Sequence, residues 1–286
     1  MSNSLWPEGL PLPTMVNEID YEAFLAARID RAVESFAAQG LTYDVEALET
    51  DPAVILLQVS TYEELLMRQS VNEAVRGQFL PFATGTDIDY LGGFHKLPRM
   101  VGESDDRYLT RIVLKTSAGD LGGSEPHYKL IAMTADIRVA DAKPYRIGRD
   151  PTVHVAIIST DNDGVPDADL LAVVDAALQS PEARLTNDTI IVAPAARAVT
   201  NVHARVWLLP DASVTVIEEM RAQLIAAWSE IMLLGRDVND TWLKAKLYHA
   251  GVHRIEIVSP ASDKQVPFTE VAVLGEVNME LAGRAF

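Results

Sequence analysis

Residues 51–80 read DPAVILLQVSTYEELLMRQSVNEAVRGQFL, and this stretch decides the fold of the N-terminal part of the chain. Asp51 followed by Pro52 is typical of a helix start, because aspartate caps free amide groups and proline fits the first helical turn. No glycine or proline follows until Gly77, so the spacing predicts a helix that runs to about Leu80. Its apolar residues cover more than one stripe of the circumference: Val54, Ile55, Leu56, Leu57, Val59, Tyr62, Leu65, Leu66 and Met67. Only one comparable helix precedes it, which favours a bundle completed by other chains.

Two more helices are predicted around this one. Asp20 is placed to cap a segment with apolar residues at helical spacing, and Gly40 follows as a stop signal. Ser104 begins a second segment, whose first-turn acids suit the positive end of a helix and whose Tyr108 and Ile112 are expected to face inward. The N-terminal part is therefore predicted to be helical.

Several glycines lie between and after these helices. We expect a turn at residues 84–86, and we interpret Gly92 and Gly93 as turn residues. The glycine-rich stretch 118–123 is predicted to be a linker and the main domain boundary.

Beyond the linker, the pattern changes to alternating strands and helices. The predicted helices are 125–135, 168–178, 216–233 and 240–249, and the predicted strands are 137–142, 153–159, 189–193, 199–208, 254–258 and 270–280. The fold class is therefore α+β, with an N-terminal α-helical bundle segment followed by two small α+β domains. The predicted limits are 1–118, 124–194 and 195–286.

Composition excludes several classes of protein. The chain has 286 residues, and 24 Lys and Arg against 41 Asp and Glu give a formal net charge of -17. This charge repels phosphate backbones, so we expect no nucleic acid partner. The absence of cysteine excludes disulfides and thiolate chemistry. Residues 1–13 lack the pattern of a signal peptide, and no apolar run approaches the roughly 20 residues that span a bilayer.

The sequence also lacks the motifs that commonly mark catalysis or cofactor binding. No phosphate-binding glycine pattern, HExxH stretch or Gly-x-Ser-x-Gly stretch occurs. His249 and His253 are separated by the helix-ending Gly251, which disfavours a zinc site. Residues 159–164 resemble the start of a calcium loop, but Leu170 stands where the bidentate ligand belongs, so we expect a polar turn. No metal or cofactor is predicted.

Paired carboxylates at 63–64, 105–106 and 218–219 are interpreted as solvated faces or helix caps, since acids are rarely buried unpaired. The sequence therefore favours a non-enzyme. Two alternatives stay open: an α+β hydrolase-type enzyme without a recognisable motif, and a monomeric binding module. An enzyme predicts a deep pocket with perturbed ionisable groups, whereas an assembly protein predicts a large apolar surface on the isolated chain.

A series of motifs in fixed order resembles the J-like baseplate proteins of contractile phage tails. They are Asp51-Pro52, residues 62–69, Asn72-Glu73-Ala74, residues 83–91, Arg99, residues 103–108 with Arg111-Ile112, residues 184–188, residues 234–238, and Gly251-Val252 with Pro260. Asn187 departs from the family pattern by interrupting its usual Leu-Thr-Asp run. The first 45 residues carry no family motif.

The resemblance implies a structural wedge protein of the baseplate, assembled in the bacterial cytoplasm and part of a phage, a bacteriocin (tailocin) or another contractile injection system. Two copies would pair with a second wedge protein, and six wedges would close a ring around the tail hub. The N-terminal helices would join a bundle that engages the sheath initiator protein, and the C-terminal domains would dimerise and link neighbouring wedges. Opening of this ring would be coupled to sheath contraction.

We expect two sets of interface residues. The helical bundle would be contacted by Leu56, Leu57, Tyr62, Leu65, Leu66, Asn72 and Arg76. The C-terminal interface would contain Trp207, Arg236 and Trp242.

Overall fold

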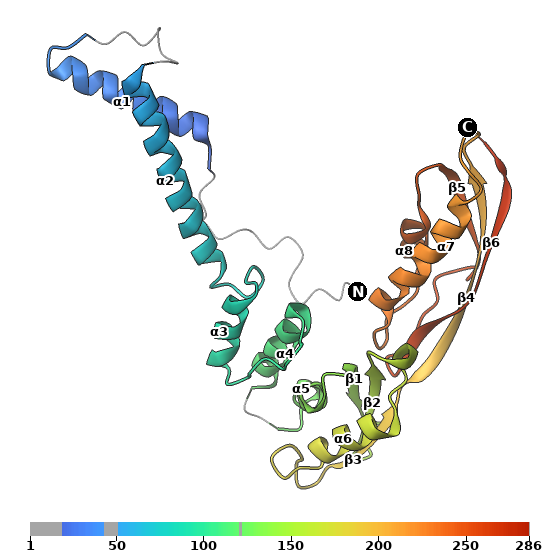
Figure 1. Cartoon of the computed structure of the whole chain (residues 1–286). Helices are drawn as coiled ribbons and strands as arrows, with labels where there is room; N and C mark the ends of the chain where they lie inside the picture. The colour runs from blue at the N-terminus through green and yellow to red at the C-terminus, as the bar shows by residue number, and fades with distance from the viewer. Residues whose placement is uncertain (1–18, 43–50, 120–121, 286) are drawn as a thin grey trace. The chain divides into compact units, whose positions relative to one another are not determined.

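The computed structural model describes residues 19–42, 51–119 and 122–285, and these form two compact units (Figure 1). The first unit contains helices α1 (Tyr21–Ala38), α2 (Pro52–Arg76), α3 (Thr86–Phe94) and the start of α4 (Asp105–Ala118). The second contains Met100–Glu103 and the chain from Arg111 onward, with two three-stranded sheets. The α+β class is confirmed. The domain limits 1–118, 124–194 and 195–286 stay predictions.

Side-chain caps begin the first two helices where the sequence predicts them. The Asp20 carboxylate accepts from the Ala23 amide at 3.2 Å, and the Asp51 carboxylate accepts from the Ala53 amide at 2.7 Å. Helix α2 ends at Arg76, short of the predicted Leu80, with Gly77 as its C-cap. A Cβ on residue 77 would lie 2.5 Å from the Asp87 Oδ2, so glycine lets the next segment approach closely.

The interpretation of Gly92 and Gly93 as turn residues is wrong, because both lie inside α3. A Cβ on Gly92 would lie 1.9 Å from the hydroxyl oxygen of Tyr108. That tyrosine is buried, and its hydroxyl donates to the Leu97 carbonyl at 2.6 Å. Gly92 is therefore required by the close packing of Tyr108 on α3, and not by turn conformation.

A buried ion pair lies within the second unit, at the part of α4 that belongs to this unit. The Arg111 Nη1 and Glu103 Oε2 atoms are 2.6 Å apart, and their side chains are 1% and 0% exposed. Arg111 also donates from Nε to the Thr134 hydroxyl of α5 (Glu125–Ala135) at 3.3 Å. Buried charges of this kind are tolerated only when they are paired and hydrogen-bonded.

The first sheet has the order β1-β2-β3, with β1 (Val139–Tyr145) antiparallel and β3 (Thr189–Pro194) parallel to β2 (Thr152–Ser159). Alternate residues of β2, Val153, Val155 and Ile157, pack in one core with residues of α5 and α6 (Ala168–Leu178). Both helices therefore cover the same face of this sheet.

The second sheet has the order β5-β4-β6. Its strands are β4 (Ala196–Leu208), β5 (Val252–Ser259) and β6 (Glu270–Arg284), and β6 runs parallel to β4 along nearly its whole length. Helices α7 (Val216–Ala227) and α8 (Asp240–Leu247) lie on the same face (Figure 1). Their core contains Val202, Ala204, Val206 and Leu208 of β4, the residues that alternate toward this face.

The helix predicted over 216–233 is α-helical only to Ala227 and continues as a 3-10 turn, η3 (Trp228–Ile231). The Trp228 indole N–H donates to the Ala272 carbonyl of β6 at 3.1 Å. This bond fixes a large side chain at the point where the helix tightens, a tertiary contact that helical periodicity does not reveal.

Candidate partner interfaces

One side of α2 packs on α1. The Arg68 guanidinium lies over the Phe24 ring at 4.3 Å, and Arg28 donates to both Ser60 and Glu64. Arg68 also pairs with Glu64 at 2.6 Å. Hydrogen bonds from Arg68 and then Arg28 hold the pKa of the Glu64 carboxyl below its ordinary value. These contacts join the two helices and place a carboxylate where two arginines neutralise it.

The other side of α2 carries an apolar stripe, which we call the exposed seam: Ile55, Val59, Tyr62 and Leu66. Their spacing of four, three and four residues places them within about 60° of one another around the helix axis. This spacing is typical of helices that pack in coiled coils. The four side chains are between 45% and 59% exposed. The seam is turned roughly 120° away from the buried positions 54 and 61 of the same helix.

A second apolar group flanks the seam. Leu56, Met67 and Val71 are between 59% and 71% exposed. Isolated apolar side chains on a surface are ordinary, but seven exposed on one helix are more than a surface helix usually carries and indicate an interface.

The structure divides the seven residues predicted for the helical bundle. Leu56, Tyr62 and Leu66 are exposed, and Arg76 is an exposed residue at the end of α2. Leu57 and Leu65 are half-buried, and Asn72 is buried. Four exposed apolar residues were not assigned, namely Ile55, Val59, Met67 and Val71. The apolar periodicity contains most of them, but it does not tell which face α1 covers.

The three predicted C-terminal residues do not lie together. Trp242 packs edge-on against Trp228 in the core, with ring centroids 5.7 Å apart. Trp207 alternates to the opposite face of the second sheet, where Arg254 lies over its ring at 4.8 Å. Arg236 donates to the Glu230 carbonyl at 3.2 Å. Of the three, Trp207 lies on the face that α7 and α8 leave uncovered.

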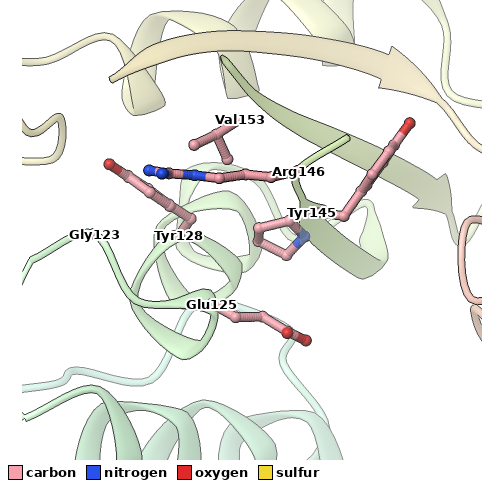
Figure 2. A pocket seen from close by; sticks show the side chains of 7 residues that line it. Gly123, Glu125, Tyr128, Tyr145, Arg146 and Val153 are labelled. Atoms are coloured by element: carbon pink, nitrogen blue, oxygen red, sulfur yellow. The ribbon is translucent and has the colours of Figure 1, made fainter. Parts of the chain in front are cut away.

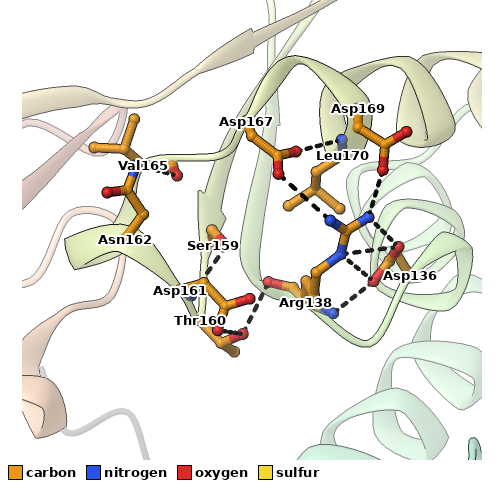
Figure 3. A network of polar contacts seen from close by, with 10 residues as sticks. All are labelled: Asp136, Arg138, Ser159, Thr160, Asp161, Asn162, Val165, Asp167, Asp169 and Leu170. Atoms are coloured by element: carbon orange, nitrogen blue, oxygen red, sulfur yellow. Dashed lines mark hydrogen bonds and ion pairs between the residues drawn. The ribbon is translucent and has the colours of Figure 1, made fainter.

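Figure 3 shows a cluster of acids around Arg138. The guanidinium pairs with Asp136 at 2.8 Å, Asp169 at 3.0 Å and Asp167 at 3.5 Å. Hydrogen bonds to Asp136 and then Asp169 raise the pKa of Arg138 above its ordinary value. Since Asp167 also caps α6 through the Leu170 amide at 2.7 Å, the cluster ties the start of α6 to the entry of β1.

The nearby polar run 159–164 forms a turn, with the short 3-10 element η2 (Asn162–Gly164) between β2 and α6. Within the described ranges 19–42, 51–119 and 122–285, no group of three His, Asp or Glu side chains is arranged to hold a metal ion.

Figure 2 shows a pocket of about 210 Å³ beside α5, lined by Tyr128, Tyr145 and Arg146 among others. The Tyr128 hydroxyl donates to Asp188 at 2.6 Å, and Arg146 donates to the other carboxylate oxygen at 2.8 Å. Burial and the hydrogen bond with Asp188 raise the pKa of Tyr128 to about 12. A phenol is protonated at neutral pH even at its ordinary pKa of 10, so the Tyr128 hydroxyl is available as the donor to Asp188.

Comparison of the sequence with known proteins identifies the family of this chain. The Baseplate J-like N-terminal domain matches residues 49–106. The chain is also 30% identical over 292 residues to baseplate protein J of Escherichia phage P2, an alignment that covers 96% of each protein. The chain belongs to the baseplate J family. In this baseplate J-family chain, the matched domain contains α2 with its exposed seam, α3 and the beginning of α4. No helix in the described part of the chain is long and apolar enough to cross a bilayer.

Proposed function

We propose that the chain is a structural wedge protein of a contractile-tail baseplate, built to assemble with other chains and not to catalyse a reaction. The single observation that carries the proposal is the exposed apolar surface of α2 within the matched family domain. A monomeric protein gains nothing from such a surface, whereas an assembly protein buries it against partner helices.

The proposed assembly has two parts. Through the exposed seam, α2 joins a helical bundle with a second copy, a second wedge protein and the sheath initiator protein. Through the second unit, the chain dimerises and contacts neighbouring wedges in a six-fold ring around the tail hub, with Trp207 on the uncovered face of the sheet. The bundle and the ring are then connected through a single chain.

This connection gives a mechanism for coupling baseplate opening to sheath contraction. Movement of one wedge against the next changes the ring contacts, and α4, whose residues belong to both units, links those contacts to the helical region. Phage tails, bacteriocins and other contractile injection systems would share this coupling.

The seam's contribution to assembly follows from its exposure. Fully burying one such side chain contributes about 1.5–3 kcal/mol, so four half-exposed side chains contribute about 4 kcal/mol together. This corresponds to a roughly 1000-fold change in affinity.

The test is co-purification of the tagged chain with the baseplate proteins encoded beside it. The double variant Val59→Asp/Leu66→Asp places charges on the seam, where both side chains are half-exposed, and should abolish co-purification. A matched double variant in the second unit, Val173→Asp/Val214→Asp, also changes exposed valines and should retain the helical partner. If the seam variant still assembles while soluble and folded, the bundle proposal fails.

A further inference from the structure

A groove of about 500 Å³ lies in the second unit, between the end of the α7–η3 segment and the first half of β6. Its apolar walls are formed by Ile225, Trp228, Leu274 and Val277. This volume is within the range of sites that hold small ligands or a few residues of a peptide.

Two arginines stand in this apolar lining. The Nε atom of Arg221 is buried and has no hydrogen-bond partner within the described residues, while its Nη1 lies 3.4 Å from the exposed Glu218. Arg197 enters from β4, and its guanidinium makes no hydrogen bond or ion pair with another described residue. Asp163 also lines the groove. Asp163 and Glu218 balance the two positive charges, but Arg197 and the Nε atom of Arg221 have no acceptor among the described residues.

A buried guanidinium N–H without a partner costs free energy, and a carboxylate supplies the acceptor that fits its planar donors best. Arginine forms such bonds with carboxylates in two-point geometry, while the flanking walls bury an apolar side chain. Nucleic acid phosphates are disfavoured as occupants, because the acidic chain repels a polyanion.

The geometry points to a docking site for an acidic segment of another baseplate protein, in which an Asp or Glu lies within two residues of a large apolar side chain. The carboxylate binds Arg197 and Arg221, and the apolar side chain enters between Ile225 and Trp228. The chemistry of the occupant follows from the groove alone, whereas its source in a baseplate protein rests on the proposed function.

The test begins with the full chain in assembled particles, carrying the photo-crosslinking residue p-benzoylphenylalanine in place of Ile225, which is exposed at the groove. The crosslinked peptide is identified by mass spectrometry. We expect a segment of a different baseplate protein with the acidic-apolar pattern, and no such segment from the control site Val214. No crosslink, a crosslink to a second copy of this chain, or a segment without a carboxylate would each overturn the proposal.

The identified segment is then synthesised as a fluorescent peptide, and its binding to the purified chain is measured by anisotropy. Replacing its acid with the matching amide should weaken binding about 10- to 100-fold, as should Arg197→Gln or Arg221→Gln in the chain. Circular dichroism checks that each variant is folded. Equal affinity of the acid and amide peptides would contradict the carboxylate site. Co-purification through the exposed seam is a separate readout, so failure here does not count against the helical bundle.

Discussion

Replacing Gly92 with alanine should destabilise the first unit, although alanine is the better helix former. The new methyl group would meet the Tyr108 hydroxyl oxygen at 1.9 Å and its ring carbon Cζ at 2.5 Å. Overpacking of a core costs about 1–3 kcal/mol, and displacing the buried hydroxyl from the Leu97 carbonyl costs about 1 kcal/mol more. The higher helix propensity of alanine offsets about 1 kcal/mol of this cost, so the free energy of unfolding should fall by about 2 kcal/mol.

The neighbouring glycine provides the control. A Cβ on Gly93 would have no atom within 4 Å, so Gly93→Ala should stabilise the chain by up to about 1 kcal/mol. Urea unfolding followed by far-UV circular dichroism compares the two variants. Adding Tyr108→Phe to Gly92→Ala removes the closest contact and should recover part of the loss. If Gly92→Ala is as stable as Gly93→Ala, the packing explanation for this glycine is refuted.

Three further predictions concern charge and packing. Arg111→Ala removes the buried cation that pairs with the Glu103 carboxylate and should lower the unfolding free energy by about 3–5 kcal/mol in urea titrations. A much smaller loss would contradict this prediction. The depressed pKa of Glu64 means that its stabilisation is present above its ordinary pKa of 4.5 and is lost as pH falls through the lower folded value. Glu64→Gln should therefore reduce the fall in melting temperature as the pH is lowered. An unchanged fall would contradict this role of Glu64. Trp242→Ala should lower the free energy of unfolding by about 3 kcal/mol, because the ring packs on Trp228. If the variant keeps its stability but no longer assembles, Trp242 is an interface residue instead.

Local signals in the sequence specify much of this fold. Asp20, Asp51 and Asp167 each cap a predicted helix, because a short acidic side chain reaches the amide groups of the first turn. Helices 125–135 and 168–178 have the bounds predicted for them. These features depend on residues close together in the chain, which is why sequence reasoning finds them.

The misplaced elements depend on contacts between distant residues. Gly92 lies inside α3 at the point where Tyr108 packs against it, and the α-helix predicted over 216–233 tightens at Trp228, which bonds to β6. Neither partner can be identified from the local sequence. The same reasoning applies to the candidate interfaces, where apolar periodicity marks Leu57 and Leu66 equally. In the folded chain Leu57 is half-buried, whereas Leu66 is exposed.

The proposed assembly buries the exposed side of α2 in the baseplate. Hydroxyl-radical footprinting tests it most directly, because Tyr62 and Met67 are 59% and 71% exposed in the isolated chain and both react readily when exposed. Oxidation of both residues is compared between the purified chain and intact particles, with the buried Met279 as a reference that should stay protected in both. We expect strong protection of Tyr62 and Met67 in the particle. Equal oxidation of these residues in the two states would contradict it.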